Sequence, residues 1–429
     1  MADLRQWHDR ANRKPLVLRG VRQCGKTWLL REFGRQYYQN LVYLNFEQDP
    51  SLAGLFETEL DPRRIIRDLS ILRGQVIDPL ETLIVFDEVQ QCPAALTSLK
   101  YFAEQAPEYA VAAAGSLLGL AVHGSSSFPV GKVDFLDLYP VSFDEFLLAS
   151  GHQGLGEYLQ TLSPGMTISA PLAAQAESLL QEYLIVGGMP KAIDSWLADH
   201  DIEQVERIQQ AILDSYSLDM AKHAGGDFAK LSAVWRSIPR QLAKENQKFI
   251  FSQVLPSARA KDLEGALEWL VAAGIVVKLT KVSRPSIPLT AYADDRYFKL
   301  YLADVGLLRR LADVPASVVI HPSGGYELFR GALVENYLLT QLLSSGLRPY
   351  FWRSDNTAEI DFLIRAGADV VPIDAKASTN TISRSMGVYR QRYDPPYWLK
   401  VSLKPTVNGN LPLYAAGDVV GYLGRWAAG

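Results

Sequence analysis

Cysteine is scarce in this chain: its 429 residues include only Cys24 and Cys92. Two cysteines are too few for a four-cysteine zinc site. Because Cys24 lies inside a glycine loop that a disulfide would lock, we expect two free thiols in a reducing cytoplasm. Long apolar runs and a signal-peptide pattern are also lacking, so we expect a cytoplasmic protein without membrane contact.

A strong charge of one sign is lacking too, since the formal net charge is −4. Nothing chain-wide therefore favours nucleic acid, and any such surface must be local. Internal repeats and low-complexity tracts are absent from the sequence. With 48% hydrophobic and 21% charged residues the chain has the composition of a globular protein, and its length predicts two to four domains.

The most informative stretch is Gly20–Thr27, which fits the phosphate-loop pattern G-x-x-x-x-G-K-[ST]. An apolar run, Leu16–Leu18, precedes it, and Trp28–Phe33 follows with helical spacing. In this context backbone N–H groups and the helix N-terminus surround phosphate oxygens. Lys26 would reach the β and γ phosphates, and the Thr27 hydroxyl would bind Mg²⁺. The alternative, a glycine turn with a surface lysine, does not explain the flanks.

A second motif supports the first: Thr82–Phe86 is a continuous apolar run that ends in Asp87 and Glu88. Such a run is typical of a strand buried on both faces of a parallel sheet. Acids at its carboxyl end lie where ligands bind in α/β sheets. We predict that Asp87 holds Mg²⁺ and that Glu88 polarises the attacking water.

Further strands are predicted at residues 41–46, 110–114 and 133–138, with helices at 61–73 and 94–106. This alternation predicts an α/β domain with a parallel sheet. Ser116 either senses the γ-phosphate or caps a helix, and Lys132 either neutralises transition-state charge or is a solvated lysine. The residues expected to bind nucleotide are Gly20, Val21, Arg22, Gln23, Cys24, Gly25, Lys26, Thr27, Trp28 and Ser116.

Four stretches, 21–27, 84–88, 115–116 and 138–147, resemble the AAA-type predicted ATPases of prokaryotes, and the resemblance covers nearly the whole chain. It implies ATP and Mg²⁺ as cofactors, a P-loop NTPase fold, a helical subdomain, a winged helix and a C-terminal domain of poorly known function. In that family the position of Lys132 is often an arginine finger, and a lysine cannot make the same bidentate contact. The expected domains are 1–150, 151–225, 226–315 and 316–429.

The middle of the chain holds the sharpest charge asymmetry. Residues 222–261 contain eight Lys or Arg against two Asp or Glu. Four of the basic residues recur every fourth position, which on a helix is one face: Arg236, Arg240, Lys244 and Lys248. Helices at 172–198, interrupted at 187–190, and at 203–221 precede this segment.

Helices followed by a strand at 275–279 favour a winged-helix module and a DNA partner for residues 222–261. The helix that would enter the groove, residues 261–270, carries acids that phosphates repel: Asp262, Glu264 and Glu268. A module that packs within the protein or contacts another protein is therefore at least as good an interpretation as a DNA-binding module.

The C-terminal segment predicts a second site on two alternating strands, 358–364 and 371–376. A turn centred between Gly367 and Ala368 places Asp361 opposite Asp374, with Cβ atoms about 5 Å apart. Two carboxylates this close repel unless a cation lies between them. A divalent metal held by Glu335, Asp361 and Asp374 would resolve the conflict.

With Lys376 beside the acids and Glu335 on a preceding helix, this pattern resembles the PD-(D/E)XK nucleases. The resemblance implies a small α/β nuclease-like domain in which Asp374 and Lys376 are catalytic and Lys376 helps activate water. The alternatives are an edge hairpin with outward polar residues and a nuclease fold reused for binding.

Three functions follow from these patterns. The first is a Mg²⁺-dependent ATPase that drives or gates a nuclease-like domain acting on nucleic acid. The second is a slow ATP switch whose C-terminal domain docks a protein partner, and the third is a defence nuclease that ATP licenses. Assembly into a homo-oligomer is compatible with all three.

Overall fold

The computed structural model describes residues 1–115, 131–223, 227–256, 258–321, 327–354, 358–379, 382–405 and 409–428. The chain forms two compact units. The first comprises Met1–Leu138 with Ala272–Ile275, and the second comprises Tyr139–Val271 with Val276–Gly429. In the described ranges no helix has the length and apolar character needed to cross a membrane.

The first unit is built on a five-stranded parallel sheet, as the alternating sequence pattern predicts, with strand order β2-β3-β4-β1-β5. Its strands are β1 (Leu16–Arg19), β2 (Asn40–Asn45), β3 (Thr82–Asp87), β4 (Ala110–Ala114) and β5 (Asp134–Asp137). Its helices are α1 (Ala2–His8), α2 (Lys26–Tyr37), α3 (Pro62–Arg73) and α4 (Pro93–Gln105), with short 3₁₀ turns η1 (Pro50–Phe56) and η2 (Val89–Gln91).

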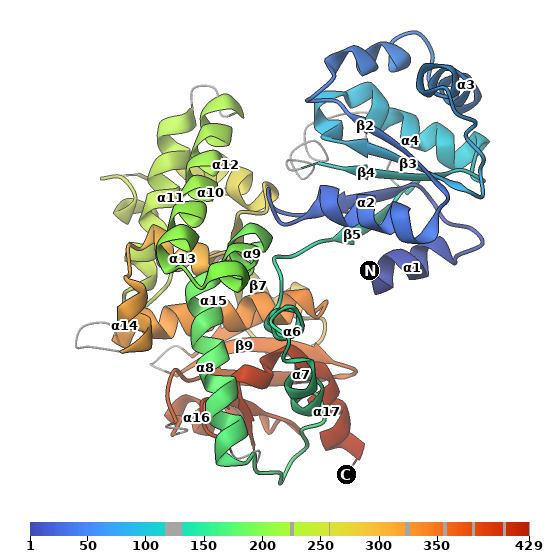
Figure 1. Cartoon of the computed structure of the whole chain (residues 1–429). Helices are drawn as coiled ribbons and strands as arrows, with labels where there is room; N and C mark the ends of the chain where they lie inside the picture. The colour runs from blue at the N-terminus through green and yellow to red at the C-terminus, as the bar shows by residue number, and fades with distance from the viewer. Residues whose placement is uncertain are drawn as a thin grey trace. The chain divides into compact units, whose positions relative to one another are not determined.

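Alternate residues of each central strand enter two different cores, which is why these strands are apolar throughout. On β3, Leu83 and Val85 pack with residues of α1 and α2, whereas Ile84 and Phe86 pack with residues of α3, α4 and η1. Helices therefore cover both faces of the sheet (Figure 1). This arrangement leaves the carboxyl edge of the sheet as the place for polar chemistry.

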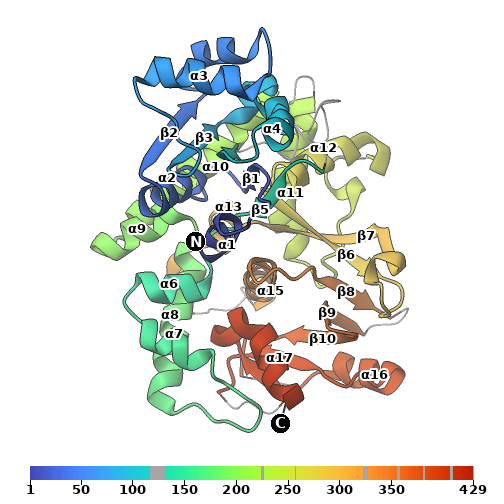
Figure 2. The same cartoon turned by 90° about the vertical axis from the view of Figure 1, so that its right-hand side faces the viewer.

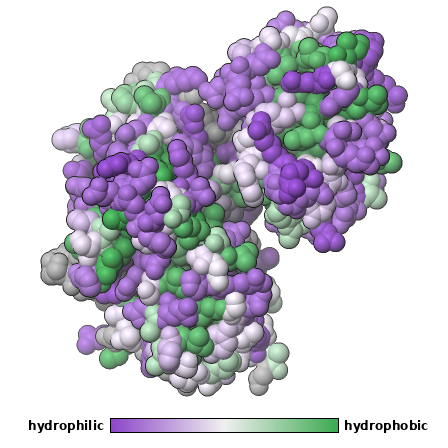
Figure 3. Space-filling model, in the orientation of Figure 1, coloured by the Kyte–Doolittle hydropathy of each residue, from purple (hydrophilic) through white to green (hydrophobic). Residues whose placement is uncertain are grey.

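Large apolar side chains stay exposed at the end of α3 and in the loop after it. They are Ile71, Leu72, Val76 and Leu80, with exposed fractions of 75, 57, 80 and 79%. Apolar patches interrupt the hydrophilic surface in this part of the first unit (Figure 3). Such a patch suits contact with another protein surface.

The second unit begins with helices. They are α6 (Phe143–Ala149), α7 (Gln153–Leu159), α8 (Ala170–Val186), α9 (Pro190–Asp199), α10 (Ile202–His223), α11 (Phe228–Leu242) and α12 (Ala260–Ala272). The later helices are α13 (Val305–Leu311), α14 (Ala316–Ile320), α15 (Glu327–Ser344), α16 (Arg384–Tyr393) and α17 (Val419–Ala428), with 3₁₀ turns η4 (Phe251–Gln253), η5 (Leu289–Tyr292) and η6 (Leu413–Asp418). The predicted interruption at residues 187–190 is confirmed, because it separates α8 from α9.

A mixed seven-stranded sheet in the order β12-β11-β10-β9-β8-β6-β7 completes this unit. Its strands are β6 (Val276–Val282), β7 (Ala293–Leu302), β8 (Tyr350–Arg353), β9 (Glu359–Ala366), β10 (Asp369–Ala375), β11 (Leu399–Ser402) and β12 (Asn410–Pro412). Figure 2 shows β7, β6, β8, β9 and β10 in succession, with α15 beside them.

The sheet bears on the predicted winged helix. Helices do precede the β6–β7 hairpin, but β6 also pairs with β8 through Lys281 and Val282, so the hairpin belongs to a larger sheet. A winged helix is not confirmed. Strands from both 226–315 and 316–429 share this sheet, and the four expected domain boundaries stay predictions.

The predicted basic stripe is wrong in its second half. Helix α11 ends at Leu242, so Arg236 and Arg240 lie on it while Lys244 and Lys248 follow it. The chain leaves the helix because it runs along β7, where the N–H of Phe249 donates to the Phe298 carbonyl oxygen. Tertiary pairing here overrides the helical spacing.

The interruption between α8 and α9 is held by a buried carboxylate. Asp304 caps α13 by accepting a hydrogen bond from the N–H of Leu307 at 2.8 Å, and it also accepts from the N–H of Gly188 at 2.5 Å. A Cβ at Gly187 would lie against the same carboxylate. Burial raises the pKa of Asp304 to about 6, although these backbone donors oppose the shift.

This pKa predicts a pH-dependent stability. The pKa of Asp304 is about 6 in the folded state and about 3.9 in the unfolded state. The stability that Asp304 contributes is therefore fully present below about pH 3.9 and is lost as the pH rises through about 6. Between pH 5 and 7.5 the wild type should lose about 1 kcal/mol relative to Asp304→Asn, which cannot ionise. Urea unfolding followed by tryptophan fluorescence at both pH values measures the free energy of unfolding of each protein. The same difference between wild type and Asp304→Asn at both pH values would contradict the prediction.

Candidate functional site

The phosphate loop connects β1 to α2, and its backbone requires glycine at two positions. Gly25 precedes Lys26 with φ 100°, a left-handed conformation that side chains disfavour. At Gly20 an added Cβ would lie against the Leu138 carbonyl oxygen and Cys24 Sγ. These constraints explain the glycines of the motif and leave the N-terminus of α2 facing the loop.

Lys26 and Thr27 begin α2 and point to different partners. The Lys26 ammonium is buried and donates to the carbonyl oxygens of Gly20 and Val21, each at 2.9 Å. The Thr27 hydroxyl donates to Asp87 Oδ2 at 2.7 Å. The loop and the end of β3 therefore meet at one point, as the two sequence motifs predict.

Asp87 is buried at the end of β3 and both of its oxygens are engaged. Oδ1 accepts the N–H of Glu88 at 3.0 Å, and Oδ2 accepts the Tyr43 hydroxyl at 2.6 Å besides Thr27. Asn45 donates to the Tyr43 oxygen at 3.2 Å. Burial, and next the bond to Asp87, raises the pKa of Tyr43 to about 12, so Tyr43 stays a donor.

Tyr43 and Asn45 are neighbours of Asp87 that the sequence motifs do not reveal. Both lie on β2, which pairs in parallel with β3 so that Asn45 stands opposite Asp87. A register assigned to the two predicted strands would have exposed them, because residues 43 and 45 share a face.

Glu88 follows Asp87 in a left-handed conformation, with φ 50°. A non-glycine residue there costs roughly 1–2 kcal/mol, and such strain is concentrated at functional positions. Its Oε2 accepts a hydrogen bond from Gln90 Nε2 at 2.5 Å. The strand end thus presents two adjacent carboxylates with distinct surroundings.

The other residues expected at the nucleotide differ in how they are placed. Trp28 is 68% exposed on the first turn of α2, and Cys24 is buried, which raises the pKa of its thiol. Lys132 forms an ion pair with Glu104 of α4 at 2.9 Å. Ser116 lies outside the described residues, so its two readings stay open.

The donor set at Thr27 and Asp87 fits Mg²⁺. In the part of the chain that the structure describes, no three His, Cys, Asp or Glu side chains gather closely enough to hold a metal ion. A phosphate-loop site needs no such group, because one hydroxyl, one carboxylate, the phosphates and water supply oxygen ligands. These two residues are therefore the ones that would hold the ion.

The second predicted site lies on β9 and β10. These strands are antiparallel, and their paired residues run from Asp369 with Ala366 to Ile373 with Phe362, which confirms the predicted register. Asp361 Oδ2 accepts the N–H of Ala375 at 2.8 Å. Burial, followed by the nearby carboxylates of Glu335 and Asp374, raises the pKa of Asp361.

Asp374 and Lys376 form a close pair at the end of β10. The Lys376 ammonium lies 3.1 and 3.0 Å from Oδ1 and Oδ2 of Asp374, which is only 2% exposed. Burial raises the pKa of Asp374 despite this ammonium. Oδ2 has no hydrogen-bond partner of good geometry among the described residues. A side-chain hydrogen bond from Ser383 also favours the charged form of this carboxylate.

Glu335 of α15 joins these acids but is held by other residues. Its Oε1 accepts from Gln247 Nε2 at 3.1 Å, and its Oε2 accepts from the Tyr301 hydroxyl at 2.5 Å. Lys299 of β7 lies 3.3 Å from the same Oε2. The sequence motifs do not reveal these three partners, because they lie 34 to 88 positions from Glu335 and only the fold brings them close.

We define the acidic cluster as Glu335, Glu359, Asp361 and Asp374. Their carboxylate oxygens are ligands of the type that divalent metal ions take. A three-carboxylate group is not assembled among the described residues. The ammonium groups of Lys299 and Lys376 lie among the carboxylates instead. Asp361 and Asp374 are the two that would hold an ion.

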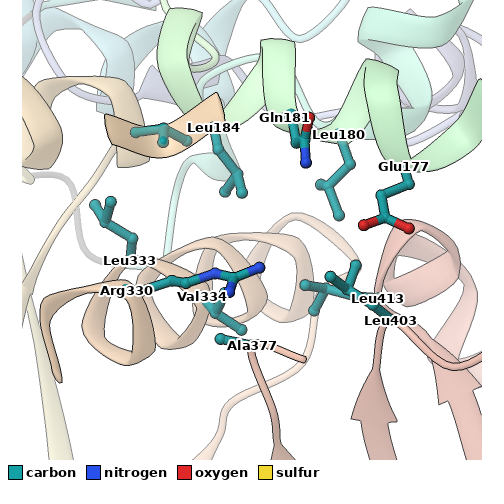
Figure 4. Close-up of a pocket in the computed structure, with 11 residues that line it drawn as sticks. Glu177, Leu180, Gln181, Leu184, Arg330, Leu333, Val334, Ala377, Leu403 and Leu413 are labelled. Atoms are coloured by element: carbon teal, nitrogen blue, oxygen red, sulfur yellow. The ribbon is translucent and has the colours of Figure 1, made fainter. Parts of the chain in front are cut away.

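A pocket between α8 and α15 in the second unit is too small for an organic ligand. Leu180, Gln181 and Leu184 line it from α8, and Arg330 and Leu333 from α15 (Figure 4). Its volume is about 20 Å³, which is room for one water molecule.

Comparison with known families assigns three regions. Residues 12–147 match the model of an AAA domain, residues 177–318 match a domain of unknown function (DUF8612), and residues 330–410 match another domain of unknown function (DUF4143). No curated protein matches the sequence of this chain.

Among solved structures, the Walker-type ATPase PABY2304 of Pyrococcus abyssi is 14% identical, with a TM-score of 0.46 over 72% of this chain and 94% of that one. Cdc6p from Pyrobaculum aerophilum is 13% identical, with a TM-score of 0.25 over 74% and 90%. The ORC2 protein of Aeropyrum pernix in its ADP form is 12% identical, with a TM-score of 0.30 over 77% and 93%. Residues 12–147 combine the match to an AAA domain with a five-stranded parallel sheet and a phosphate-loop motif.

Proposed function

We propose that the first unit hydrolyses ATP with Mg²⁺. The observation that carries this proposal is the 2.7 Å contact between Thr27 and Asp87, which joins the phosphate loop to the end of β3. Loop N–H groups and the N-terminus of α2 would bind the phosphates. The Lys26 ammonium would exchange the carbonyl oxygens of Gly20 and Val21 for phosphate oxygens.

The remaining residues divide the work of hydrolysis. Thr27 and Asp87 would hold Mg²⁺, which neutralises the charge that develops on the phosphates. Tyr43, with Asn45 behind it, keeps the Asp87 carboxylate turned toward Thr27. Glu88 would orient and polarise the attacking water.

The first prediction tests binding. Lys26→Ala should weaken ATP affinity by about a hundredfold or more, because it removes the one buried ammonium at the loop, and hydrogen bonds to charged groups are the strong ones. Titration with a fluorescent ATP analogue in Mg²⁺ measures this, with the exposed Lys100→Ala of α4 as the matched control. Tight ATP binding by Lys26→Ala would refute the site.

We further propose that the acidic cluster cleaves phosphodiester bonds in nucleic acid with one or more divalent ions, and that ATP turnover drives or gates it. The support is the register of β9 and β10, whose end pair, Phe362 with Ile373, adjoins Asp361 and Asp374, together with the contact of Lys376 with Asp374. Asp374 and Lys376 would act on the attacking water. The basic segment 222–261 and the C-terminal domain would bind the DNA.

The contacts of the basic segment reduce what it offers to phosphates. Arg240 donates to the Gln253 carbonyl oxygen, and Lys244 Nζ donates to Gln253 Oε1 at 2.6 Å. Lys248 lies 4.1 Å from the ring centre of Tyr297. DNA binding by this segment would have to displace or share these contacts.

A slow ATP switch with a protein-docking C-terminal domain is the second candidate function. It is favoured by the basic residues in the acidic cluster, since Lys299, Lys376 and Arg353 already form ion pairs with Glu335, Glu359 and Asp374 without a metal. The exposed apolar patch at residues 71–80 would suit a homo-oligomer or another protein. ATP turnover that depends on Glu88 and rises with DNA would favour the first function over this one.

A further inference from the structure

Lys299 is a buried lysine in the acidic cluster that no sequence motif predicts. It is 2% exposed on β7, and its Nζ lies 2.6 Å from Glu359 Oε1 and 3.3 Å from Glu335 Oε2. Burial alone would lower the pKa of Lys299, but the carboxylates of Glu335, Glu359 and Asp361 outweigh it and raise that pKa. The side chain is therefore a fixed positive charge.

The four acids of the cluster fall into two pairs with different partners. Glu335 and Glu359 share Lys299, and each has further donors: Tyr301 and Gln247 for Glu335, and Arg353 at 3.4 Å for Glu359. These two carboxylates are compensated by the protein itself. Most acceptor positions of these two carboxylates are therefore already occupied by protein donors.

Asp361 and Asp374 form the other pair, which is less completely satisfied. Asp361 is partly exposed, and its Oδ2 accepts one backbone N–H, that of Ala375. The Asp374 carboxylate is buried, with the Lys376 ammonium 3.0 Å from its Oδ2 and a side-chain hydrogen bond from Ser383. Two facing carboxylates with one ammonium leave a place that a divalent cation would fill.

We infer that Lys299 takes the place of a second metal ion, so that the acidic cluster accepts one divalent cation, at Asp361 and Asp374. This inference rests on the metal dependence proposed above. An ammonium nitrogen 2.6 to 3.3 Å from two carboxylates excludes an ion that would need the same oxygens at roughly 2.0–2.6 Å. Lys299 thereby sets the number of ions and keeps Glu335 and Glu359 in position.

The inference also joins two regions of the chain. Lys299 lies within the matched region 177–318, whereas all four acids lie within 330–410. A C-terminal segment without β7 would lack the charge that holds two of its acids. The two regions of unknown function therefore build one site.

The alternative is a structural ion pair that only makes the burial of two glutamates tolerable. Both readings predict that loss of Lys299 destabilises the protein, because unpaired buried charges are costly. They differ in metal binding. If Lys299 replaces an ion, its removal frees Glu335 and Glu359 for that ion.

The test is a calorimetric Mn²⁺ titration of the full chain without nucleotide, with Asp87→Asn in every protein to silence the phosphate loop. The variants are Lys299→Met, Lys299→Met with Glu359→Gln, Asp374→Asn, and Lys278→Met as a matched lysine control on the neighbouring strand. Thermal unfolding with and without Mn²⁺ accompanies each titration.

The parent should bind one Mn²⁺ that Asp374→Asn loses. Lys299→Met should bind a second Mn²⁺, or bind the first about tenfold more tightly or better, because a repelling charge is gone. The double variant restores the net charge and should return to parental binding, and Lys278→Met should match the parent. In melting curves, Mn²⁺ should raise the Tm of Lys299→Met more than that of the parent.

The outcomes separate this inference from the proposed function. Unchanged Mn²⁺ binding by Lys299→Met, or failure of Mn²⁺ to restore a Lys299→Met protein that does not fold alone, overturns the inference. A parent that binds no Mn²⁺ beside a Lys299→Met that binds one refutes the metal dependence of the native site and the single native ion at Asp361 and Asp374, and leaves only the replacement of an ion by Lys299 supported. If neither binds Mn²⁺, both are wrong.

Discussion

Replacing Glu88 by glutamine is expected to lower kcat for ATP hydrolysis by about a hundredfold to a thousandfold while Mg²⁺-ATP still binds. The size follows from general-base catalysis, which contributes on the order of 10²–10⁴. Binding should survive because Lys26, Thr27 and Asp87 are untouched and glutamine preserves the side-chain shape. The left-handed backbone at residue 88 is kept as well.

Steady-state phosphate release and ATP binding, measured on the same preparations, separate kcat from affinity. Glu81→Gln is the matched control, because Glu81 is an exposed carboxylate just before the first residue of β3, the strand that Glu88 follows. Its kcat should equal that of the wild type. An unchanged kcat in Glu88→Gln would show that another group orients the water and would shift weight to the slow-switch function.

The phosphate-loop region of the first unit could be predicted from sequence because the residues that form it are close together in the sequence. Strand, loop and helix N-terminus are contiguous at residues 16–33, and glycine requirements within the loop are visible in the motif. Asp87 is recognisable since a fully buried parallel strand must end at the ligand edge of its sheet. What the motifs missed is the support from Tyr43 and Asn45, which depends on the pairing of β2 with β3.

In the C-terminal region only the register of the β9–β10 hairpin could be predicted from the sequence. Alternation and a glycine turn fix the register of β9 and β10, so Asp361 opposite Asp374 follows from sequence alone. Lys299 and Tyr301 of β7 instead contact Glu335, and Lys299 also contacts Glu359. No local rule pairs residues so far apart in the sequence. The prediction that Lys244 and Lys248 lie on the same helix as Arg236 and Arg240 was wrong for a similar reason. Helix α11 ends at Leu242, and the chain then pairs with β7 at Phe249.

Asp374→Asn is expected to reduce metal-dependent cleavage of nucleic acid by about a thousandfold or more. The change keeps the shape of a side chain that is 2% exposed but removes the charge that faces Lys376 and would face the ion. Losing that charge removes a metal ligand and a positioning group for water together, and each such loss is typically worth two or more powers of ten.

The assay would offer single-stranded DNA, duplex DNA and RNA with Mg²⁺ or Mn²⁺, with and without ATP. Asp369→Asn, at the start of the same strand β10, is the matched control and should cleave as the wild type does. Melting temperatures guard against misfolding, since Asp374→Asn leaves the half-buried Lys376 less well paired. Cleavage that persists in Asp374→Asn would place the activity elsewhere.

The ATP arm of this assay decides how the two units are related. If Lys26→Ala abolishes cleavage while Asp374→Asn leaves ATP turnover intact, information passes from the nucleotide to the acidic cluster, and ATP gates the nuclease. If cleavage is independent of Lys26, the two sites act separately. If no substrate is cut under any condition, the lysine-filled cluster is a scaffold, and the ATP switch with a protein partner becomes the function that the geometry supports best.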